Sequence, residues 1–255
     1  MPDPVALPRA FLASPLAHRG LHDSARQRPE NSRAAFAAAI AAGYGIECDL
    51  QLSADGQAMV FHDATLERLT DTTGPVQART AGQLAAIPLR GDTEGIPDFA
   101  GVLTLVDGRV PLLVELKDQT GMLGPEGGAL ERAAADAVRG YPGPLAFMSF
   151  NPHSVARIAD LAPEVPRGLT TCAFAPADWP GLPDDRRAEL AAIADFDRVG
   201  ASFVSHQASD LAAAPVVALR RAGVPILCWT IRSAQEQGSA RKLADNITFE
   251  GYLPA

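Results

Sequence analysis

The chain has 255 residues, 47% of them hydrophobic, and carries a formal net charge of -8 at pH 7. That length and apolar content can bury one large core, and α/β barrels of about 200 to 250 residues commonly form a single domain. The acidic balance, without a cluster of Lys and Arg, argues against nucleic acid or an anionic membrane surface as a partner, but it leaves a local anion site open. We therefore expect one domain over residues 1–255.

No stretch approaches the ~18 consecutive apolar residues that a bilayer-spanning helix needs, and the first twenty residues lack a charged segment before a long apolar run. The three cysteines, Cys48, Cys172 and Cys228, are far apart and show no CxxC spacing, so we expect neither a disulfide framework nor a zinc site. These features predict a soluble, cytoplasmic protein without a membrane anchor. They leave its oligomeric state open.

Short β-rich runs alternate with alanine-rich helical segments along the chain. In chain order, strands are predicted within residues 15–18, 46–53, 58–62, 111–117, 144–150, 167–174, 203–205 and 225–231. Helices are predicted within residues 31–43, 128–140, 152–161, 215–223 and 234–245. About eight strands with helical crossovers predict a closed (β/α)8 barrel, the TIM-barrel architecture, although an open doubly wound sheet fits the same alternation.

Two local features refine this pattern. In the helix over 31–43, Asn31 or Ser32 can cap the first turn and Gly43 can end the last. Residues 64–100 are rich in Thr, Gly and Pro and break the alternation. We expect them to form a small insertion after the third predicted strand, over one mouth of the barrel.

The strand over 46–53 carries two carboxylates within an apolar pattern. Its period of two places Glu47 and Asp49 on one face, roughly 7 Å apart. The Asp55-Gly56 dipeptide that follows is a hairpin signal, and a hairpin there brings His62 opposite Asp49 or close to it. Such a hairpin would make one of the strands antiparallel or carry it away from the barrel.

A third carboxylate, Glu115, shares one face of the apolar strand over 111–117 with Lys117. A solvated edge strand would explain one carboxylate pair, but charges inside two apolar strands would cost several kcal/mol if they were buried without partners. Three such carboxylates favour a bound cation. All-oxygen ligation suits a hard divalent ion, Mg²⁺ or Ca²⁺, better than zinc.

Two histidines each end an apolar run, His18 after the first predicted strand and His62 after the third. His62 taken alone is better explained as a core histidine. His18 at the end of another strand shifts the interpretation toward a pair of imidazoles at the C-terminal mouth, where barrel enzymes place their sites. Arg19 beside His18 can offer a planar fork to a phosphate, although a surface ion pair explains it equally well.

Six motifs in order, AHRG, PENS, ECDLQLSADG, VFHD, VELK and SFNP, resemble those of the glycerophosphodiester phosphodiesterase family, and CWTI resembles its final strand. The resemblance covers residues 16–231. It implies a distorted TIM barrel with a small insertion, a divalent metal, and hydrolysis of glycerophosphodiesters to sn-glycerol 3-phosphate and an alcohol. The implied site residues are the acid–base pair His18 and His62, the metal ligands Glu47, Asp49 and Glu115, and the phosphate contacts Arg19 and Lys117.

The chain departs from the family pattern near its C-terminus. Arg232 follows CWTI where the family usually has Asn, and NITFEGY stands where a TD.P ending is usual. These departures leave the predicted chemistry unchanged. They mean that the pocket for the alcohol or the glycerol need not have the family's residues. Phe150 and Trp229 end strands and can line that pocket, or simply pack in the core.

Three further residues are candidates for supporting the site. Asp63 follows His62 directly and can hold an imidazole tautomer. Glu30 and Asn31 can orient the site, but helix capping alone also explains Asn31. The expected partner is a small glycerophosphodiester. A related activity on lysophospholipids or another phosphodiester, and an inactive barrel that binds a phosphorylated ligand, are the alternatives.

Overall fold

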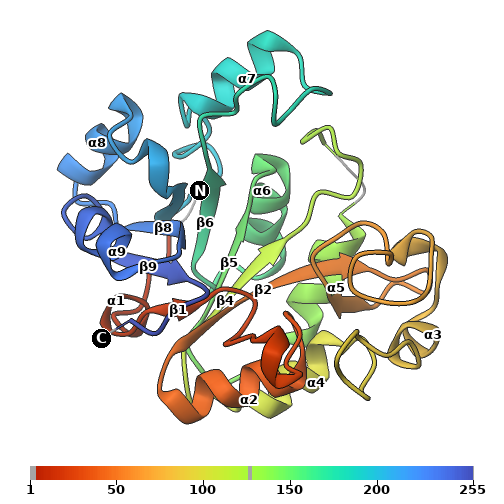
Figure 1. Cartoon of the computed structure of the whole chain (residues 1–255). Coiled ribbons are helices and arrows are strands. Elements are labelled where there is room, and N and C mark those ends of the chain that lie inside the picture. Colours follow the sequence, from red (N-terminus) through yellow and green to blue (C-terminus); the bar gives the residue numbers. More distant parts are fainter. Residues whose placement is uncertain (1–3, 126–127, 255) are drawn as a thin grey trace.

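Eight parallel strands close into a barrel in the computed structural model, which describes residues 4–125 and 128–254 (Figure 1). The barrel strands are β1 (Leu16–Ala17), β2 (Gly45–Leu52), β4 (Leu112–Leu116), β5 (Leu145–Ser149), β6 (Arg167–Thr171), β7 (Phe203–Gln207), β8 (Ile226–Ile231) and β9 (Asn246–Phe249). The ring closes because β1 pairs in parallel with both β2 and β9. The predicted TIM barrel is therefore confirmed, and the open sheet is excluded.

Helices lie between the strands around this ring. They are α1 (Ala10–Ala13), α2 (Arg33–Ala42), α3 (Ala81–Ala85), α4 (Phe99–Val106), α5 (Ala129–Ala137), α6 (Pro152–Leu161), α7 (Asp184–Ala191), α8 (Ala214–Arg221) and α9 (Ala234–Ala240), with 3-10 turns η1 (Ser24–Arg26), η2 (Val76–Ala78) and η3 (Ala208–Asp210). Within residues 4–125 and 128–254, none of the helices combines the length and apolar character that a bilayer crossing requires.

The caps of α2 follow the sequence closely. Ser32 Oγ accepts a hydrogen bond from the backbone N–H of Ala35 at 3.0 Å, and Gly43 ends the helix with a φ of 75°. A side chain at a positive φ would be strained, so glycine suits this end. Of the two predicted N-caps, Ser32 is thus the one that acts, and Asn31 is free for another contact.

Two assignments of the strands need correction. The predicted strand at 58–62 is not a barrel strand: β3 (Ala58–Val60) pairs antiparallel with the end of β2, with Leu50 opposite Val60. The eighth barrel strand is β9, which the sequence pattern missed. Its sequence lacks the pattern of a strand because it begins with a polar residue, Asn246. In the structure this side chain points inward, and its Nδ2 donates to the carbonyl oxygens of Phe11 and Ser14.

Inside the barrel, an apolar layer fills the end at which the strands begin. It contains inward-facing residues of the strands together with Phe11 of α1, which is fully buried: Leu7, Phe11, Leu16, Leu113, Ala146, Met148, Phe203 and Leu227. The outward faces of the strands, including Cys48, pack with the surrounding helices in a larger cluster. Since side chains alternate along a strand, Glu47 and Asp49 on either side of Cys48 face the interior.

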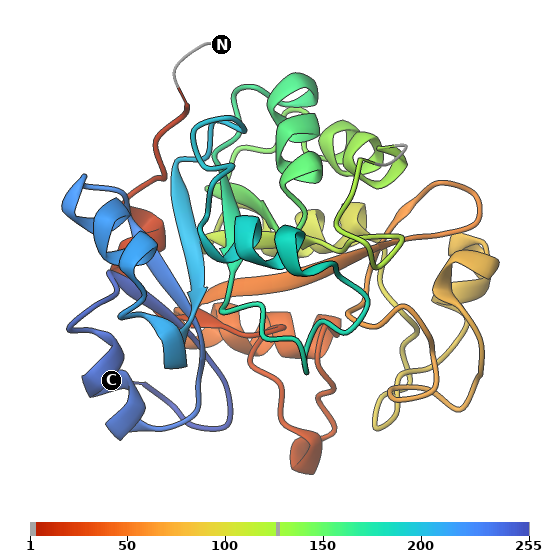
Figure 2. The same cartoon turned by 90° about the horizontal axis from the view of Figure 1, so that it is seen from above.

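The segment between β3 and α4 forms a small unit at one side of the barrel (Figures 1 and 2). It carries η2 and α3 and has its own apolar cluster: Met59, Phe61, Leu66, Val76, Leu84, Leu89 and Ile96. Arg68 in this unit reaches back to the barrel and donates to Glu30 and Asp63. We propose that residues 64–100, which include most of this unit and the first two residues of α4, are an insertion within a single-domain chain.

Candidate active site

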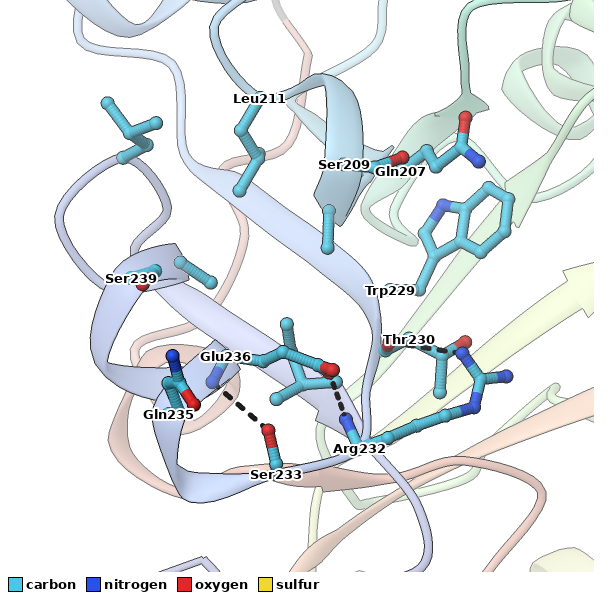
Figure 3. A pocket seen from close by; sticks show the side chains of 14 residues that line it. Gln207, Ser209, Leu211, Trp229, Thr230, Arg232, Ser233, Gln235, Glu236 and Ser239 are labelled. Atoms are coloured by element: carbon cyan, nitrogen blue, oxygen red, sulfur yellow. Dashed lines mark hydrogen bonds between the residues drawn. The ribbon is translucent and has the colours of Figure 1, made fainter.

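Two neighbouring cavities open where the barrel strands end. The smaller, of about 180 Å³, is lined by nine of the predicted site residues: His18, Arg19, Glu47, Asp49, His62, Glu115, Lys117, Phe150 and Trp229. The larger, of about 690 Å³, lies beside it between η3, β8 and α9 (Figure 3). The first of these, which we call the catalytic cavity, gathers residues from β2, β4, β5, β6, β8 and β9 and from the loops after β1, β3, β4, β5 and β8.

The three predicted carboxylates meet on neighbouring strands because β2 and β4 pair with Asp49 opposite Glu115. Glu47, Asp49 and Glu115 are 2%, 1% and 6% exposed, and one oxygen from each lies within 4.8 Å of the others. Burial, reinforced by the charges of the other two carboxylates, raises the pKa of Glu47 well above its usual value. Such a cluster of buried oxygen ligands can hold a metal ion.

Lys117 bridges two of these carboxylates. Its Nζ lies 2.8 Å from Asp49 Oδ1 and 2.7 Å from Glu115 Oε1. Burial by itself would lower the pKa of Lys117, but the two carboxylates outweigh it and hold that pKa above its usual value. Burial likewise opposes ionisation of Asp49, yet Lys117, His62 and Arg19 hold its pKa well below the usual range. Lys117 and Asp49 are therefore both charged.

Arg19 is held in place by an unusual backbone turn at the end of β1. Its φ is 54°, and Gly20 follows with a φ of 80°. A Cβ at Gly20 would come within 2.9 Å of Ala35 and Phe36, so glycine is required there. The turn directs the Arg19 backbone N–H to Glu47 Oε2 at 3.0 Å, while its Nε lies 3.4 Å from Asp49 Oδ2. This explains the HRG motif.

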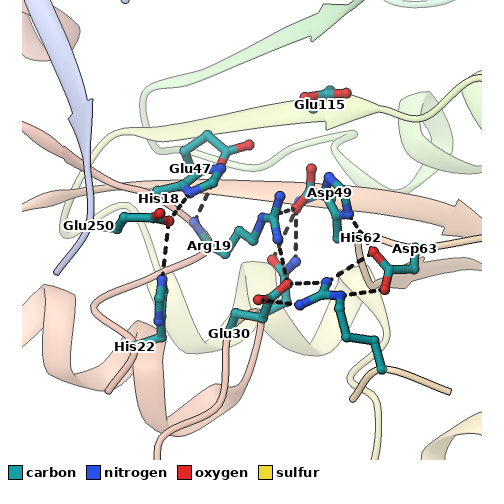
Figure 4. Close-up of polar contacts among 12 residues, drawn as sticks. His18, Arg19, His22, Glu30, Glu47, Asp49, His62, Asp63, Glu115 and Glu250 are labelled. Atoms are coloured by element: carbon teal, nitrogen blue, oxygen red, sulfur yellow. Dashed lines mark hydrogen bonds and ion pairs between the residues drawn. The ribbon is translucent and has the colours of Figure 1, made fainter. Parts of the chain in front are cut away.

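Each of the two histidines bonds a carboxylate through the same ring nitrogen (Figure 4). His18 Nδ1 lies 2.5 Å from Glu250 Oε2, and His62 Nδ1 lies 2.6 Å from Asp63 Oδ1. An ionised carboxylate only accepts, so the proton sits on Nδ1 and leaves Nε2 for a ligand. Burial lowers the pKa of His18, and the hydrogen bond that His18 donates to Glu250 partly offsets this effect.

Glu250 is a site residue that the sequence pattern missed. It follows β9, inside the segment that departs from the family pattern, and it also binds Arg232 at 2.7 Å and lies 3.6 Å from His22. The hydrogen bond with His18, followed by that with His22, holds its pKa well below the usual range. Recognising β9 as the closing strand would have placed Glu250 at the mouth.

The PENS motif contacts the catalytic cavity from outside the barrel. Asn31, with a φ of 56°, donates from Nδ2 to Asp49 Oδ2 at 2.9 Å. Glu30 accepts from Arg19 at 2.6 Å and from Arg68 at 2.7 Å. Arg68 was not singled out in the sequence; it lies in the region predicted as an insertion, where no pattern marks it. Glu30 and Asn31 thus fix Arg19 and Asp49 in orientation.

Aromatic rings form one wall of the catalytic cavity. Phe150 meets Trp229 edge to face at 5.5 Å between centroids and packs against Phe174 and Trp179. Trp229 Nε1 donates to the carbonyl oxygen of Ser205 at 3.0 Å. The predicted aromatic pair therefore lines the cavity and packs at the same time. Two buried hydroxyls in its lining, Thr170 Oγ1 and Thr248 Oγ1, have no hydrogen-bond partner among the described residues.

The comparisons with known proteins agree with this geometry. Residues 18–246 match the model of the Glycerophosphoryl diester phosphodiesterase family. YhdW of Bacillus subtilis strain 168 is 28% identical over 241 residues, with 89% of this chain and 88% of that protein covered. A glycerophosphodiester phosphodiesterase of Caldanaerobacter subterraneus subsp. tengcongensis is 31% identical over 163 residues, with 60% of this chain and 65% of that protein covered.

Among solved structures, an Oleispira antarctica phosphodiesterase in complex with the product sn-glycerol-3-phosphate superimposes with a TM-score of 0.76 at 24% identity. The superposition covers 94% of each chain. A glycerophosphodiester phosphodiesterase from Agrobacterium tumefaciens gives a TM-score of 0.68 at 24% identity, over 92% of this chain and 95% of that one. At these identities the structural matches establish the fold, and the family match over 18–246 establishes the relationship: the chain belongs to the glycerophosphoryl diester phosphodiesterase family.

Proposed function

We propose that the protein hydrolyses glycerophosphodiesters to sn-glycerol 3-phosphate and an alcohol. The observation that carries this proposal is the arrangement of two carboxylate-bound imidazoles, His18 and His62, around a buried cluster of three carboxylates in one cavity. Hydrolysis breaks the P–O bond to the alcohol, forms a P–O bond to the oxygen of water, and moves one proton from that water to the alcohol. The relatives' names and the family membership support the same activity.

The two imidazoles are suited to the proton movements of this reaction. One would accept the proton of the attacking water or hydroxyl, and the other would donate a proton to the leaving alkoxide. For both histidines the Nδ1 atom is engaged by a carboxylate, so Nε2 would be the reacting atom. Arg19 and Lys117, which line the same cavity, would bind the charged phosphate oxygens.

The carboxylate cluster fits a hard divalent ion. Its ligands are all oxygen, and among the described residues three buried carboxylates outnumber the two cations that contact them, Arg19 and Lys117. Glu47, Asp49 and Glu115 would hold the ion, with Mg²⁺ or Ca²⁺ the expected metal. A bound ion of this kind supplies positive charge to the nonbridging phosphate oxygens.

The test is release of sn-glycerol 3-phosphate from a panel of glycerophosphodiesters, with and without exhaustive chelation. We expect chelation to abolish release and Mg²⁺ or Ca²⁺ to restore it. Calorimetric titration should detect ion binding to the wild type and its loss in Glu115→Gln. A matched control is Glu131→Gln, because Glu131 is also a buried carboxylate but bonds Ser154 away from the cavity.

Full activity of the metal-free protein would remove the metal from the proposal. Hydrolysis of lysophospholipids or other phosphodiesters in preference to the whole panel would move the activity to that alternative substrate class. Binding of sn-glycerol 3-phosphate without turnover of any diester would leave a ligand-binding barrel.

A further inference from the structure

The larger cavity adjoins the catalytic cavity directly. Three residues of β8 and its following loop, Trp229, Thr230 and Arg232, line both. Trp229 thus borders both spaces, and Gln207 lies next to its indole (Figure 3). A molecule bound at the phosphate-binding residues of the catalytic cavity can therefore continue into the second cavity without leaving the protein surface.

The sizes of the two cavities indicate how a diester would divide between them. At about 180 Å³, the catalytic cavity is smaller than the ~300 Å³ at which ligand pockets usually begin, whereas the second, at about 690 Å³, lies within the usual range. The catalytic cavity also holds the charged groups and the free hydroxyls of Thr170 and Thr248. It suits the glycerol and the phosphate, and the rest of the diester needs the second space.

Uncharged hydrogen-bonding side chains and apolar side chains share the lining of the second cavity. Gln207, Ser209, Gln235 and Ser239 all face it, and none of the four side chains bonds another residue in the described part of the chain. Leu211 and other apolar side chains complete the lining. Free amides and hydroxyls over an apolar surface suit a ligand that carries several hydroxyl groups on a carbon frame.

The charges in this cavity argue against an ionic ligand. Arg232 binds Glu250 at 2.7 Å, and the Arg232 backbone N–H donates to Glu236 Oε2 at 2.7 Å. In the described lining, Arg232 and Glu236 are the charged residues, and their formal charges sum to zero. Trp229 is the aromatic side chain of that lining, whereas a quaternary ammonium group is usually held by several aromatic faces.

We infer that this second cavity, hereafter the alcohol cavity, binds the leaving alcohol of the diester and selects a polyhydroxyl alcohol such as a cyclitol or a sugar. The inference rests on the proposed hydrolysis of glycerophosphodiesters. In the bound diester, the ester oxygen of the alcohol lies near Trp229, and the hydroxyl groups reach the amides and serines at the end of β7 and in η3 and α9.

The test compares kcat/KM for three diesters of sn-glycerol 3-phosphate whose alcohols are inositol, choline and methanol. Methanol is too small to enter the alcohol cavity, so its diester reports on the catalytic cavity alone. We expect the wild type to favour the inositol diester over the choline diester by about tenfold, the effect of roughly one well-made hydrogen bond to a ligand.

Filling the cavity should remove this preference. Ser239→Phe places a ring in the alcohol cavity and should lower kcat/KM for the inositol diester by about tenfold or more, with the methanol diester changed less than about twofold. Lys242→Phe is the matched control, because Lys242 is exposed and lies outside the lining. Gln235→Leu removes hydrogen bonds without filling the space. It should lower kcat/KM for the inositol diester alone, and by a smaller factor than Ser239→Phe.

The outcomes separate this inference from the function on which it rests. If none of the three diesters is hydrolysed, the proposed function fails. Suppose that the diesters are hydrolysed, but Ser239→Phe lowers kcat/KM equally for all three or leaves kcat/KM for the inositol diester unchanged. The alcohol cavity is then not the site that binds the alcohol. A wild-type preference for the choline diester that Ser239→Phe abolishes would retain the site and overturn the polyhydroxyl class.

Discussion

The two carboxylate–imidazole pairs of the catalytic cavity have the same local geometry and different origins. His62 bonds its neighbour Asp63 at 2.6 Å, so two adjacent residues of one loop make this pair. His18 bonds Glu250 at 2.5 Å across 232 positions of sequence, which join only when β9 docks beside β1. One pair is thus set by the local chain, and the other depends on closure of the barrel.

The surroundings of the pairs differ in a similar way. Asp63 is shared with Arg68, which belongs to the small unit beside the mouth, and the His62 side chain is 31% exposed. Glu250 is shared with Arg232 at the edge of the alcohol cavity, and the His18 side chain is 14% exposed. One imidazole is therefore positioned by a contact within one loop, and the other by a contact between distant segments. We expect the two pairs to respond differently to mutation.

Removing the imidazoles should have the largest effect. We expect His18→Ala and His62→Ala each to lower the rate on a natural diester by roughly 10²- to 10⁴-fold, the usual range for one acid–base group. A nitrophenyl diester has a leaving group that needs no proton, so the variant that lacks the acid should recover much of its rate on that substrate. Steady-state assays on both substrates would assign the two roles.

Near-normal rates for both folded variants on the natural diester would show that the histidines are structural. Equal recovery of both on the nitrophenyl diester would show that the pairs are not divided into an acid and a base.

Changing the carboxylates should have a smaller effect. Glu250→Gln and Asp63→Asn keep the shape of each side chain but offer an amide to the ring, so the favoured tautomer and its orientation are lost. We expect each to lower kcat by about 10- to 100-fold, as is usual for groups that orient a reacting imidazole. Glu250→Asp, which keeps the charge, should retain more activity than Glu250→Gln, and the reverse order would contradict an orienting role.

The pH profile distinguishes the pairs further. Glu250 raises the pKa of His18 against the lowering effect of burial, so removal of its charge in Glu250→Gln should lower that pKa further. Whichever limb of the pH–rate profile belongs to His18 should therefore move to lower pH. Profiles of kcat/KM for wild type and variant would measure the movement; a limb that moves to higher pH would contradict the assignment.

The smallest effect should be on stability, and here the pairs should differ most clearly. Glu250→Gln weakens a contact between the first and last barrel strands and should reduce the free energy of unfolding by about 1 to 2 kcal/mol at neutral pH. Asp63→Asn alters a local pair and should cost less. Because the pKa of Glu250 is lowered on folding, its contribution is present above the unfolded value of about 4.3 and is lost as the pH falls.

Denaturant titrations of the wild type and the two variants at pH 7 would measure both losses of stability. An equal loss of stability in Asp63→Asn would mean that closure of the barrel adds nothing to the His18 pair.

Local patterns carried the parts of the site that could be predicted. Alternation along β2 placed Glu47 and Asp49 inward, and the hairpin signal placed His62 near Asp49. In the structure, the backbone N–H of Phe61 donates to the carbonyl oxygen of Asp49 at 3.0 Å, and His62 is the next residue. Each inference needed only neighbours in sequence. The barrel itself followed from the alternation of strands and helices.

The missed features depend on contacts between distant segments. Asn246 is a poor strand former, and its place in β9 comes from hydrogen bonds to Phe11 of α1 and to Ser14, far away in the chain. Glu250 could not be assigned without that strand. The alcohol cavity joins η3, β8 and α9, and no spacing within one segment marks it.

The apolar layer that contains Phe11 has a kinetic consequence. It closes the barrel at the end where the strands begin, so substrate and both products must pass through the same mouth. The alcohol is held by uncharged side chains of the alcohol cavity, whereas Arg19 and Lys117 of the catalytic cavity hold the phosphate, so the alcohol should depart first and sn-glycerol 3-phosphate last. The last product to leave binds the free enzyme and competes with the incoming diester, whereas the free alcohol should inhibit only noncompetitively. Product-inhibition kinetics would therefore reveal the order in which the two products leave the enzyme.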